Sequence, residues 1–440
     1  MQRPAFQTSN IVTIESLDQE GRGVAHRDGK VLFVESALPG ETVEFVPLRR
    51  KPKFEVGTAG AVLRESASRV APRCRYFGTC GGCSIQHLDS RAQVAMKQRV
   101  LEADLEHIGK VVPETMLPAI HGPAWSYRQR ARFSVRVVPK KGGVLVGFHE
   151  KRSSYVADME SCEVIPPRIS RLLVPLRRLV ESLSISNRVP QLELAAGDDS
   201  DVLVLRHLQP LTASDIDRLR QFAADTGVCL FLQPGGPETA HPLEHGADPL
   251  VEYALPDFDL RLAFSPTEFT QVNHAVNRVL VRRALNLLEV EPGHRVADLF
   301  CGLGNFSLAA ARRGAEVVGI EGSEPLVRRA ADNARRNGLD GRATFIQADL
   351  FEIDRAWLRR LGRFDRMLID PPRTGAISVV HALDDDAPRR IVYVSCNPAT
   401  LARDAAVLVH VQGYRLEAAG VVNMFPQTSH VESIAVFCHK

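Results

Sequence analysis

The sequence predicts an α/β fold in which a doubly wound parallel sheet forms the carboxyl-terminal part of the chain. From Ser265 onward, short apolar segments alternate with amphipathic segments of helical period, which is typical of parallel strands joined by helices. One apolar segment, residues 294–300, runs directly into the glycine-containing turn 301–305 (CGLGN). Four successive apolar segments also end on an acidic residue. Because such sheets bind ligands at the carboxyl ends of their strands, this edge is the expected site.

The elements of this part can be placed in order. A helix is expected to begin at Ser265, because residues 265–268 (SPTE) have the pattern of a capping box with proline at the first helical position. The last two strands are expected to form an antiparallel hairpin at the sheet edge. The expected strands are residues 294–300, 315–321, 342–349, 363–370, 390–395, 414–422 and 431–438, and the expected helices are residues 305–314 and 325–338.

The pattern changes twice along the chain, which is long enough for two or three domains. Residues 1–67 alternate strands with turn residues, as in a small antiparallel β-barrel. Residues 68–262 are β-rich, with one helix near 168–186 and an amphipathic helix at 91–109 that we expect to pack on the last domain. Residues 263–440 form the α/β domain.

The composition is that of an ordinary globular protein, with 45% hydrophobic and 24% charged residues and a net charge of +3. The sequence predicts neither a signal peptide nor a bilayer-spanning segment, so we expect a cytoplasmic monomer without a membrane partner, and we infer no protein partner. In that compartment the eight cysteines are more typical of ligands, nucleophiles or core residues than of disulfides. With so small a net charge, any nucleic-acid surface must be a local patch.

The acids at the strand ends indicate a cofactor site. They are Asp298, Glu321, Asp349 and Asp370, and they are expected to converge on one crevice. An acid after the second strand can accept hydrogen bonds from ribose hydroxyl groups. A nicotinamide dinucleotide is the competing ligand, but the third glycine of its fingerprint is missing here. The stiff loop 370–373 (DPPR) suits a methyl-acceptor site better than hydride transfer, and the pattern therefore favours S-adenosylmethionine.

Cys396 is the candidate nucleophile. It follows the apolar segment 390–395 and precedes a helix that is expected to begin near Thr400. This position is at the cofactor edge and near a helix amino terminus, whose dipole lowers the pKa of a thiol. By position alone, an inert buried cysteine fits the pattern equally well.

A base near such a cysteine would suit methylation at carbon 5 of uracil. Residues 426–432 (PQTSHVE) offer Glu432 as the candidate base and His430 as a weaker one. Thiolate addition at carbon 6 makes carbon 5 nucleophilic, and the base then removes the carbon-5 proton so that the thiolate can leave. Taken alone, residues 426–432 fit a surface turn better.

With these residues assembled, the chain resembles the RNA 5-methyluridine methyltransferase family. The matching segments are SPTEFTQVN, DLFCGLGNFSLAAA, GIEGSE, DPPRTG, VSCNPATLARD and PQTSHVE, in the family's order. The resemblance implies a Rossmann-like class I S-adenosylmethionine methyltransferase domain with Cys396 as nucleophile and Glu432 as base. It further implies that the methyl donor is contacted by Gln271, Phe300, Asn305, Glu321, Asp349 and Asp370. Thr270, where the family usually has an aromatic residue, and a missing proline after the glycine turn are the visible departures.

Two basic segments are candidate RNA contacts. Residues 1–67 resemble a TRAM domain, an oligonucleotide-binding (OB)-type barrel of RNA-modifying enzymes, which implies phosphate contact by a basic loop, Arg49, Arg50, Lys51 and Lys53. Residues 121–152 hold eight Lys or Arg against one acid, the composition expected of a phosphate-binding surface. Four arginines there have a spacing that places them on one face of a strand: Arg128, Arg130, Arg132 and Arg136.

A second cluster of cysteines is spaced like a ligand set. Cys74, Cys80 and Cys83 lie on a glycine-rich segment, and Cys162 is the best remaining cysteine for a fourth ligand. Spacing alone is compatible with zinc or with an iron–sulfur cluster. The resemblance to the ribosomal-RNA members of the family implies a [4Fe-4S] cluster with a structural role.

Several functions fit these features to different degrees. The barrel and the four cysteines favour 23S ribosomal RNA as the substrate, by resemblance at uridine 1939, over another 23S site or transfer RNA. Cytosine-5 methylation would need a second cysteine in the Asp370 loop, and amino-group methylation of adenine would leave Cys396 unexplained. A non-catalytic RNA-binding iron–sulfur protein would leave the crevice acids unused.

Overall fold

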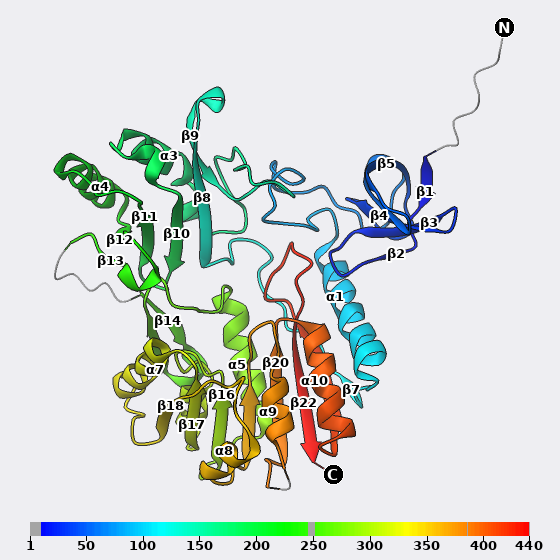
Figure 1. The fold of residues 1–440 in the computed structure, drawn as a ribbon, viewed down its shortest axis with the longest axis vertical. Helices are drawn as coiled ribbons and strands as arrows, with labels where there is room; N and C mark the ends of the chain where they lie inside the picture. Colours follow the sequence, from blue (N-terminus) through cyan, green and yellow to red (C-terminus); the bar gives the residue numbers. More distant parts are fainter. Residues whose placement is uncertain (1–9, 245–250, 385, 440) are drawn as a thin grey trace.

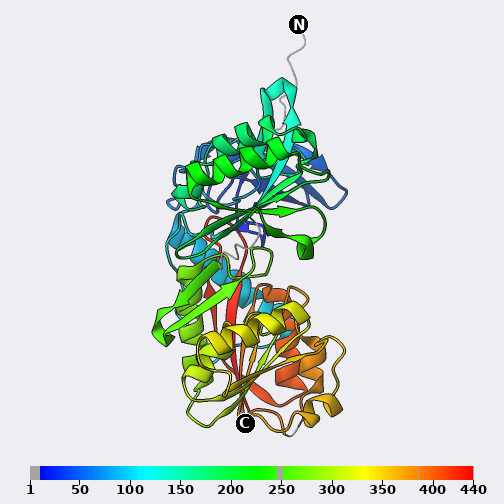
Figure 2. The ribbon, with the colours of Figure 1, turned by 90° about the vertical axis from the view of Figure 1, so that its left-hand side faces the viewer.

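The computed structural model describes residues 10–244, 251–384 and 386–439, which form three six- to eight-stranded sheets and one two-stranded sheet. The carboxyl-terminal sheet and its helices occupy the lower part of Figure 1, the middle sheet the upper left and the amino-terminal sheet the upper right. Figure 2, turned by 90°, shows the middle and carboxyl-terminal parts at opposite ends of the long axis. No helix within these ranges is long and apolar enough to cross a membrane.

The carboxyl-terminal sheet has eight strands and confirms the predicted α/β alternation. In spatial order they are β18 (Ala343–Gln347), β17 (Glu316–Glu321), β16 (Arg295–Leu299), β19 (Arg366–Ile369), β20 (Arg390–Ser395), β22 (Glu432–His439), β21 (Tyr414–Val422) and β7 (Thr115–Met116). The helices are α5 (His274–Leu288), α6 (Ser307–Arg312), α7 (Glu324–Arg336), α8 (Arg355–Arg360), α9 (Ile377–Ala382) and α10 (Pro398–His410). The central strands β16, β19, β20 and β22 are buried on both faces, which explains their nearly continuous apolar sequences.

The edge of this sheet differs from the prediction, in which the hairpin of the last two strands was the edge. The first five strands run parallel, whereas β22 lies antiparallel between β20 and β21. The edge strand is β7, which is distant in sequence and pairs in parallel with β21. Sequence patterns did not reveal β7, because a two-residue strand carries too little periodicity.

The helix predicted to begin at Ser265 is wrong. The Ser265 backbone N–H donates to the Glu268 carboxylate at 2.7 Å, as in half of a capping box, but the chain continues as a turn. Helix α5 begins only at His274, capped by the Asn273 side chain, which accepts from the Val276 N–H. The Pro266 carbonyl instead accepts from the Arg130 guanidinium at 3.0 Å, so a tertiary contact competes with the local helix signal.

The middle sheet has the strand order β13 (His241–Pro242), β12 (Cys229–Gln233), β11 (Asp201–Arg206), β10 (Gln191–Ala196), β8 (Arg130–Val138) and β9 (Gly143–Gly147). Its helices are α2 (Pro167–Ser170), α3 (Leu173–Ser182) and α4 (Ala213–Thr226), and the hairpin β14 (Val251–Leu255) and β15 (Leu260–Phe264) follows. Helices α2 and α3 match the one predicted helix, but α4 was missed. Its signal was present, since the Thr212 side chain and Asp215 form a complete capping box.

The amino-terminal sheet has the order β1 (Ile11–Thr13), β5 (Thr42–Arg50), β6 (Phe54–Arg64), β4 (Lys30–Glu35), β3 (Gly23–Arg27) and β2 (Ser16–Leu17). A turn at Asp28, where φ is 51°, joins β3 to β4. In the described part of the chain no pairing joins β1 to β2, so the structure does not show the closed barrel that was expected. Arg49 and Arg50 end β5 rather than lying in a loop.

Helix α1 (Ser90–Asp104) continues as one π-helical turn, Leu105–Gly109, in agreement with the predicted helix and its glycine end. Its Val100 and Leu101 belong to the same hydrophobic cluster as Leu401 of α10. The helix therefore packs on the carboxyl-terminal sheet and its helices, although it lies before the middle sheet in sequence (Figure 1).

A buried ion pair joins the amino-terminal sheet to the segment that follows it. Glu41 is fully buried, and its carboxylate accepts from the Arg69 guanidinium and from the backbone N–H groups of Leu38 and Ser66. Burial raises the pKa of Glu41, but the hydrogen bonds from Arg69 and the backbone outweigh it and hold the pKa below its usual value. This pair therefore stabilises the fold above the ordinary glutamate pKa and loses that contribution as the pH falls through the lowered pKa.

We expect Arg69→Ala to lower the local stability of residues 36–50 by about 3 kcal/mol at pH 7, because it leaves a buried carboxylate unpaired. Hydrogen exchange of peptides covering this segment measures the change. Arg220→Ala is the control, since it removes an ion pair with Glu244 in which both side chains are about half exposed, and should cost less than about 1 kcal/mol. Equal effects of the two substitutions would contradict the assignment.

Candidate active site

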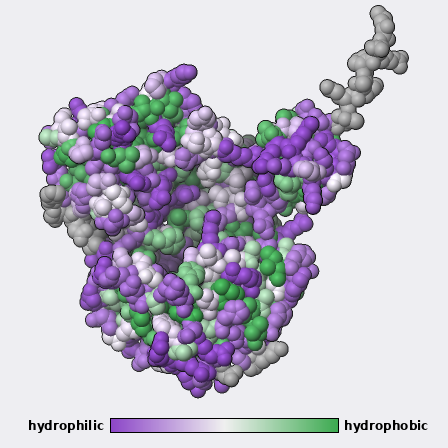
Figure 3. All heavy atoms as spheres, viewed as in Figure 1, coloured by the Kyte–Doolittle hydropathy of each residue, from purple (hydrophilic) through white to green (hydrophobic). Residues whose placement is uncertain are grey.

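A cleft with a cavity volume of about 500 Å³ lies at the carboxyl ends of the parallel strands. Figure 3 shows the visible face hollowed between the middle and carboxyl-terminal parts. The cleft brings together most of the residues that the sequence pointed to: Gln271, Phe300, Glu321, Asp349, Asp370, Cys396, His430 and Glu432. Its aromatic walls were not anticipated, and they include Phe269, Phe351 and Phe425.

The glycine turn after β16 shapes one end of the cleft. Phe300 and Gly302 both have positive φ, 61° and 56°, a conformation that is costly for a phenylalanine. Glu321, at the end of β17, spans this turn, because its carboxylate accepts from the Gly302 N–H at 3.1 Å and from the Ser323 N–H at 2.9 Å. The acid and the turn therefore hold each other in place at the mouth of the cleft.

Two of the predicted residues of this region face inward. Asp298 is buried behind the turn, where the Ser307 hydroxyl donates to it and burial raises its pKa to about 7. It is absent from the cleft lining, so three of the four strand-end acids converge there. The Asn305 amide is also turned away, since it exchanges two 3.0 Å hydrogen bonds with Asn277 and accepts one from the Tyr253 hydroxyl at 2.9 Å.

Cys396 and Glu432 face each other because of the strand register. Ser395, the last residue of β20, pairs with Ser433 of the antiparallel strand β22. The residue after Ser395 and the residue before Ser433 therefore lie side by side at the same end of the sheet. Cys396 is half-buried there, and Glu432 is buried with 3% of its surface exposed.

Burial dominates the acid–base properties of this pair. Burial, followed by the charges of Glu432 and Asp370, raises the pKa of the Cys396 thiol to about 11. Helix α10 begins at Pro398, near the expected position, but the predicted lowering of the thiol pKa by its dipole is outweighed. Burial, followed by the nearby Asp370, also raises the pKa of Glu432 well above its usual value. Burial raises the pKa of Asp370 itself to about 8.

Arg373 is a charged cleft residue whose importance the sequence reasoning missed. Its charge lowers the pKa of both Cys396 and Glu432, against the effect of burial. Its backbone carbonyl accepts from the Asn397 amide at 3.1 Å and from the Thr400 hydroxyl at 3.3 Å, which ties the Pro-Pro-Arg loop to the start of α10. Its position in the DPPR segment was the available signal.

His430 lies beside these groups but is a poor base in this setting. Its ring packs edge-on against Phe425 with centroids 4.5 Å apart, and its Nδ1 lies 3.3 Å from the Arg373 guanidinium. Burial, together with the positive charges of Arg373 and Lys97, lowers the pKa of His430 to about 4. The imidazole is therefore neutral near neutral pH.

The four cysteines of the predicted ligand set also come together. Cys74, Cys80, Cys83 and Cys162 line one small cavity and are free thiols. Burial raises the pKa of Cys83 to about 12 and that of Cys162 to about 11. Across the residues described, no three side chains of His, Cys, Asp or Glu are arranged to hold a single metal ion. The donor set suits a group that is bound by four thiolates.

The arginines of β8 share one face, but not as an unopposed positive strip. Ala131, Phe133 and Val135 are buried, whereas the alternating Arg132 and Arg136 are exposed; Arg128 lies before the strand begins. Glu193 of the neighbouring strand β10 pairs with Arg130 at 2.7 Å and with Arg132 at 3.3 Å. Counting charges along 121–152 could not reveal this acid, because it comes from another strand.

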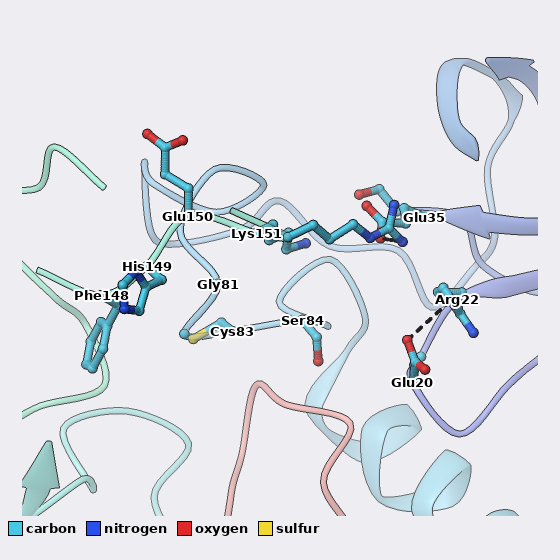
Figure 4. A pocket seen from close by; sticks show the side chains of 14 residues that line it. Glu20, Arg22, Glu35, Gly81, Cys83, Ser84, Phe148, His149, Glu150 and Lys151 are labelled. Atoms are coloured by element: carbon cyan, nitrogen blue, oxygen red, sulfur yellow. Dashed lines mark ion pairs between the residues drawn. The ribbon is translucent and has the colours of Figure 1, made fainter. Parts of the chain in front are cut away.

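A second hollow, of about 440 Å³, lies between the amino-terminal sheet and the cysteine segment (Figure 4). Its lining mixes both signs of charge. Arg22 pairs with Glu20 at 3.2 Å, and Arg152 pairs with Glu35. Lys151 also lines the hollow, with its ammonium group 4.9 Å from the centre of the Phe77 ring. The charged side chains that line this hollow connect the amino-terminal sheet to the cysteine segment.

Comparison with known proteins places this site in a family. Residues 250–440 match the model of a family described as tRNA (Uracil-5-)-methyltransferase. A 23S rRNA (uracil(1939)-C(5))-methyltransferase RlmD from Nitrosospira multiformis is 64% identical over 97% of this chain and 98% of its own, and one from Aromatoleum aromaticum is 63% identical over 97% and 99%. The crystal structure of Pyrococcus abyssi tRNA (uracil-54, C5)-methyltransferase in complex with S-adenosyl-L-homocysteine has a TM-score of 0.76 and 25% identity, covering 98% of this chain and 100% of that one. The chain belongs to the RNA 5-methyluridine methyltransferase family.

Proposed function

We propose that the protein transfers a methyl group from S-adenosylmethionine to carbon 5 of uridine 1939 in 23S ribosomal RNA. The observation that carries the chemistry is the placement of Cys396 opposite Glu432 in one cleft, imposed by the β20–β22 register. The names of relatives that are 58–64% identical support the ribosomal substrate. We further infer that it acts in the cytoplasm as a monomer.

The reaction needs a thiolate and then a base. The Cys396 sulfur adds to carbon 6 of the uracil, forming an Sγ–C6 bond and an enolate whose carbon 5 is nucleophilic. Bound S-adenosylmethionine supplies the methyl group that carbon 5 takes up. The Glu432 carboxylate then removes the carbon-5 proton, the electron pair of that C–H bond restores the C5–C6 double bond, and the Sγ–C6 bond breaks to return the thiolate.

The charges of the cleft suit both steps. The raised pKa of Cys396 means that the thiolate needs a nearby cation, and Arg373 is the exposed cation in the cleft. The raised pKa of Glu432 makes its carboxylate a stronger base than an ordinary glutamate once it is ionised. Because Cys396 lies inside a cleft, the uridine must leave its stack to reach it.

For the methyl donor we propose contacts from five of the six residues implied by the family resemblance: Gln271, Phe300, Glu321, Asp349 and Asp370. All of them line the cleft. The Glu321 carboxylate is placed to accept from ribose hydroxyl groups, as expected at the end of a second strand. Asn305 supports the glycine turn instead, because its side-chain amide is engaged by Asn277 and Tyr253.

We also propose that Cys74, Cys80, Cys83 and Cys162 hold a [4Fe-4S] cluster with a structural role. Four thiols around one cavity support this assignment.

For RNA binding, we propose that the amino-terminal sheet is an OB-type module. The basic end of β5 and the exposed arginines of β8 are the proposed phosphate contacts. Transfer RNA is the alternative substrate, because the similar Pyrococcus abyssi structure is that of a tRNA enzyme. Methylation assays on 23S fragments and on transfer RNA distinguish the two.

We expect Cys396→Ala to lower methylation of a 23S fragment by roughly a thousandfold or more, as for loss of other nucleophiles. It should also abolish the covalent complex with a fragment that contains 5-fluorouridine. Denaturing gels with radiolabelled S-adenosylmethionine measure both. Cys229→Ala is the matched control, since Cys229 is a half-buried cysteine of β12 outside the cleft. A covalent complex with the 5-fluorouridine fragment that still forms in Cys396→Ala would contradict the mechanism.

We expect Glu432→Gln to accumulate a covalent, methylated complex with ordinary uridine, because the carbon-5 proton can no longer be removed. Release of methylated RNA in a single-turnover experiment is the measurement. His430→Gln serves as the comparison and should release product at close to the wild-type rate. If the effects are exchanged between the two variants, His430 and not Glu432 is the base.

We expect anaerobically purified protein to contain iron and acid-labile sulfide without zinc. Cys162→Ser should lower the iron content and the visible absorbance, because it removes one of four thiolate ligands, whereas Cys229→Ser should leave both unchanged. Metal and sulfide analysis measures the result. Stoichiometric zinc without sulfide would overturn the cluster assignment.

A further inference from the structure

Lys97 is a buried cation that the reaction described above does not use. It lies on α1, and none of its surface is exposed. Its ammonium group donates to the Asn423 side-chain oxygen at 2.7 Å and to the Phe425 carbonyl at 2.9 Å. Burial of an ammonium group is costly unless hydrogen bonds and an opposite charge compensate for it.

The loop that Lys97 contacts leads directly into the proposed base, Glu432. Residues 423–431 connect β21 to β22, and Glu432 is the first residue of β22. The neighbouring Gln93, one helical turn earlier on α1, exchanges two 3.0 Å hydrogen bonds with Gln427. Gln427 has a φ of 67°, so external contacts stabilise a backbone conformation that is unfavourable for a glutamine. Lys97 and Gln93 thus attach α1 to the start and the middle of this loop.

The charges around Lys97 are few. Within the described ranges, the titratable groups that interact with it are Glu432 at the start of β22 and His430 in the loop. Asp370 and Arg373 act in turn on Glu432. Burial lowers the pKa of Lys97 to about 7, and the charge of Glu432 opposes this change. Lys97 in turn lowers the pKa of Glu432, against burial and Asp370.

Hydrogen bonding alone does not account for a lysine at this position, because a neutral side-chain amide could donate to the same two oxygens at a smaller cost of burial. What the ammonium group adds is a positive charge that acts on Glu432. We propose that Lys97 is a positioning residue that holds the loop before β22 and favours the ionised form of the Glu432 carboxyl group for removal of the carbon-5 proton. This inference rests on the proposed role of Glu432 as the base.

The test separates the chemical steps. A 5-fluorouridine fragment reports addition and methyl transfer without proton removal, and ordinary uridine reports release as well. We expect Lys97→Met to form the fluorouridine complex at close to the wild-type rate. For ordinary uridine, the acidic limb of the release rate should move upward by about one pH unit or more, the change typical of losing a nearby opposite charge. Lys97→Arg should restore the wild-type pH profile.

Arg99→Met is the matched control, because it removes a positive charge from an exposed position of the same helix and should leave the profile unchanged. Circular dichroism checks that each variant is folded, and Lys97→Gln replaces Lys97→Met if the latter does not fold. An unshifted acidic limb in a folded, uncharged variant overturns the inference. So does a loss in Lys97→Met that is equal at every pH. If Glu432→Gln releases product normally, the proposed base itself fails, whatever the Lys97 variants do.

Discussion

The register between β20 and β22 is the constraint on which the active site depends. Because the two strands are antiparallel, the end of one meets the start of the other, and the Ser395–Ser433 pair leaves Cys396 and Glu432 adjacent. A slip of one residue would turn the side chains of β22 to opposite faces and separate the proposed nucleophile from the proposed base. The inserted strand therefore places a thiol and a carboxyl group side by side at the edge where the cofactor is proposed to bind, as the proposed covalent mechanism requires.

Burial determines the protonation behaviour of this site, and it opposes the charged forms that the proposed reaction needs. Asp370, Cys396 and Glu432 are all pushed towards their neutral forms, whereas the proposed reaction needs a thiolate and later a carboxylate. Two cations oppose this tendency from different directions. Arg373 comes from the loop after β19 and is exposed, and Lys97 comes from α1 and is buried.

The loop before β22 links the site to distant parts of the chain. The backbone N–H groups of Ser84 and Ile85, next to the cysteine segment, donate to the Gln427 carbonyl at 3.0 and 3.1 Å, and the Tyr127 hydroxyl donates to the Pro426 carbonyl at 2.8 Å. A structural role for a cluster held by the neighbouring cysteines is consistent with these contacts, since they brace the loop that carries the base. The amino-terminal half of the chain is thus part of the support of the catalytic cleft.

The sequence by itself determined the alternation of strands and helices from β16 onward, the glycine turn, the strand-end acids and the position of Cys396, because these depend on local periodicity and on the edge rule for parallel sheets. Gln271 and Phe300 were implied only by the family resemblance. The helix start predicted at the SPTE segment was wrong, since a contact with Arg130 lies outside the local pattern. Only the tertiary structure decided what depends on partners distant in the chain: the inward turn of Asn305 towards Asn277, the pairing of Arg130 with Glu193, and the contacts of Lys97 with the loop before Glu432. Periodicity records which face of an element is buried, whereas the charges that meet there are set by how separate elements pack.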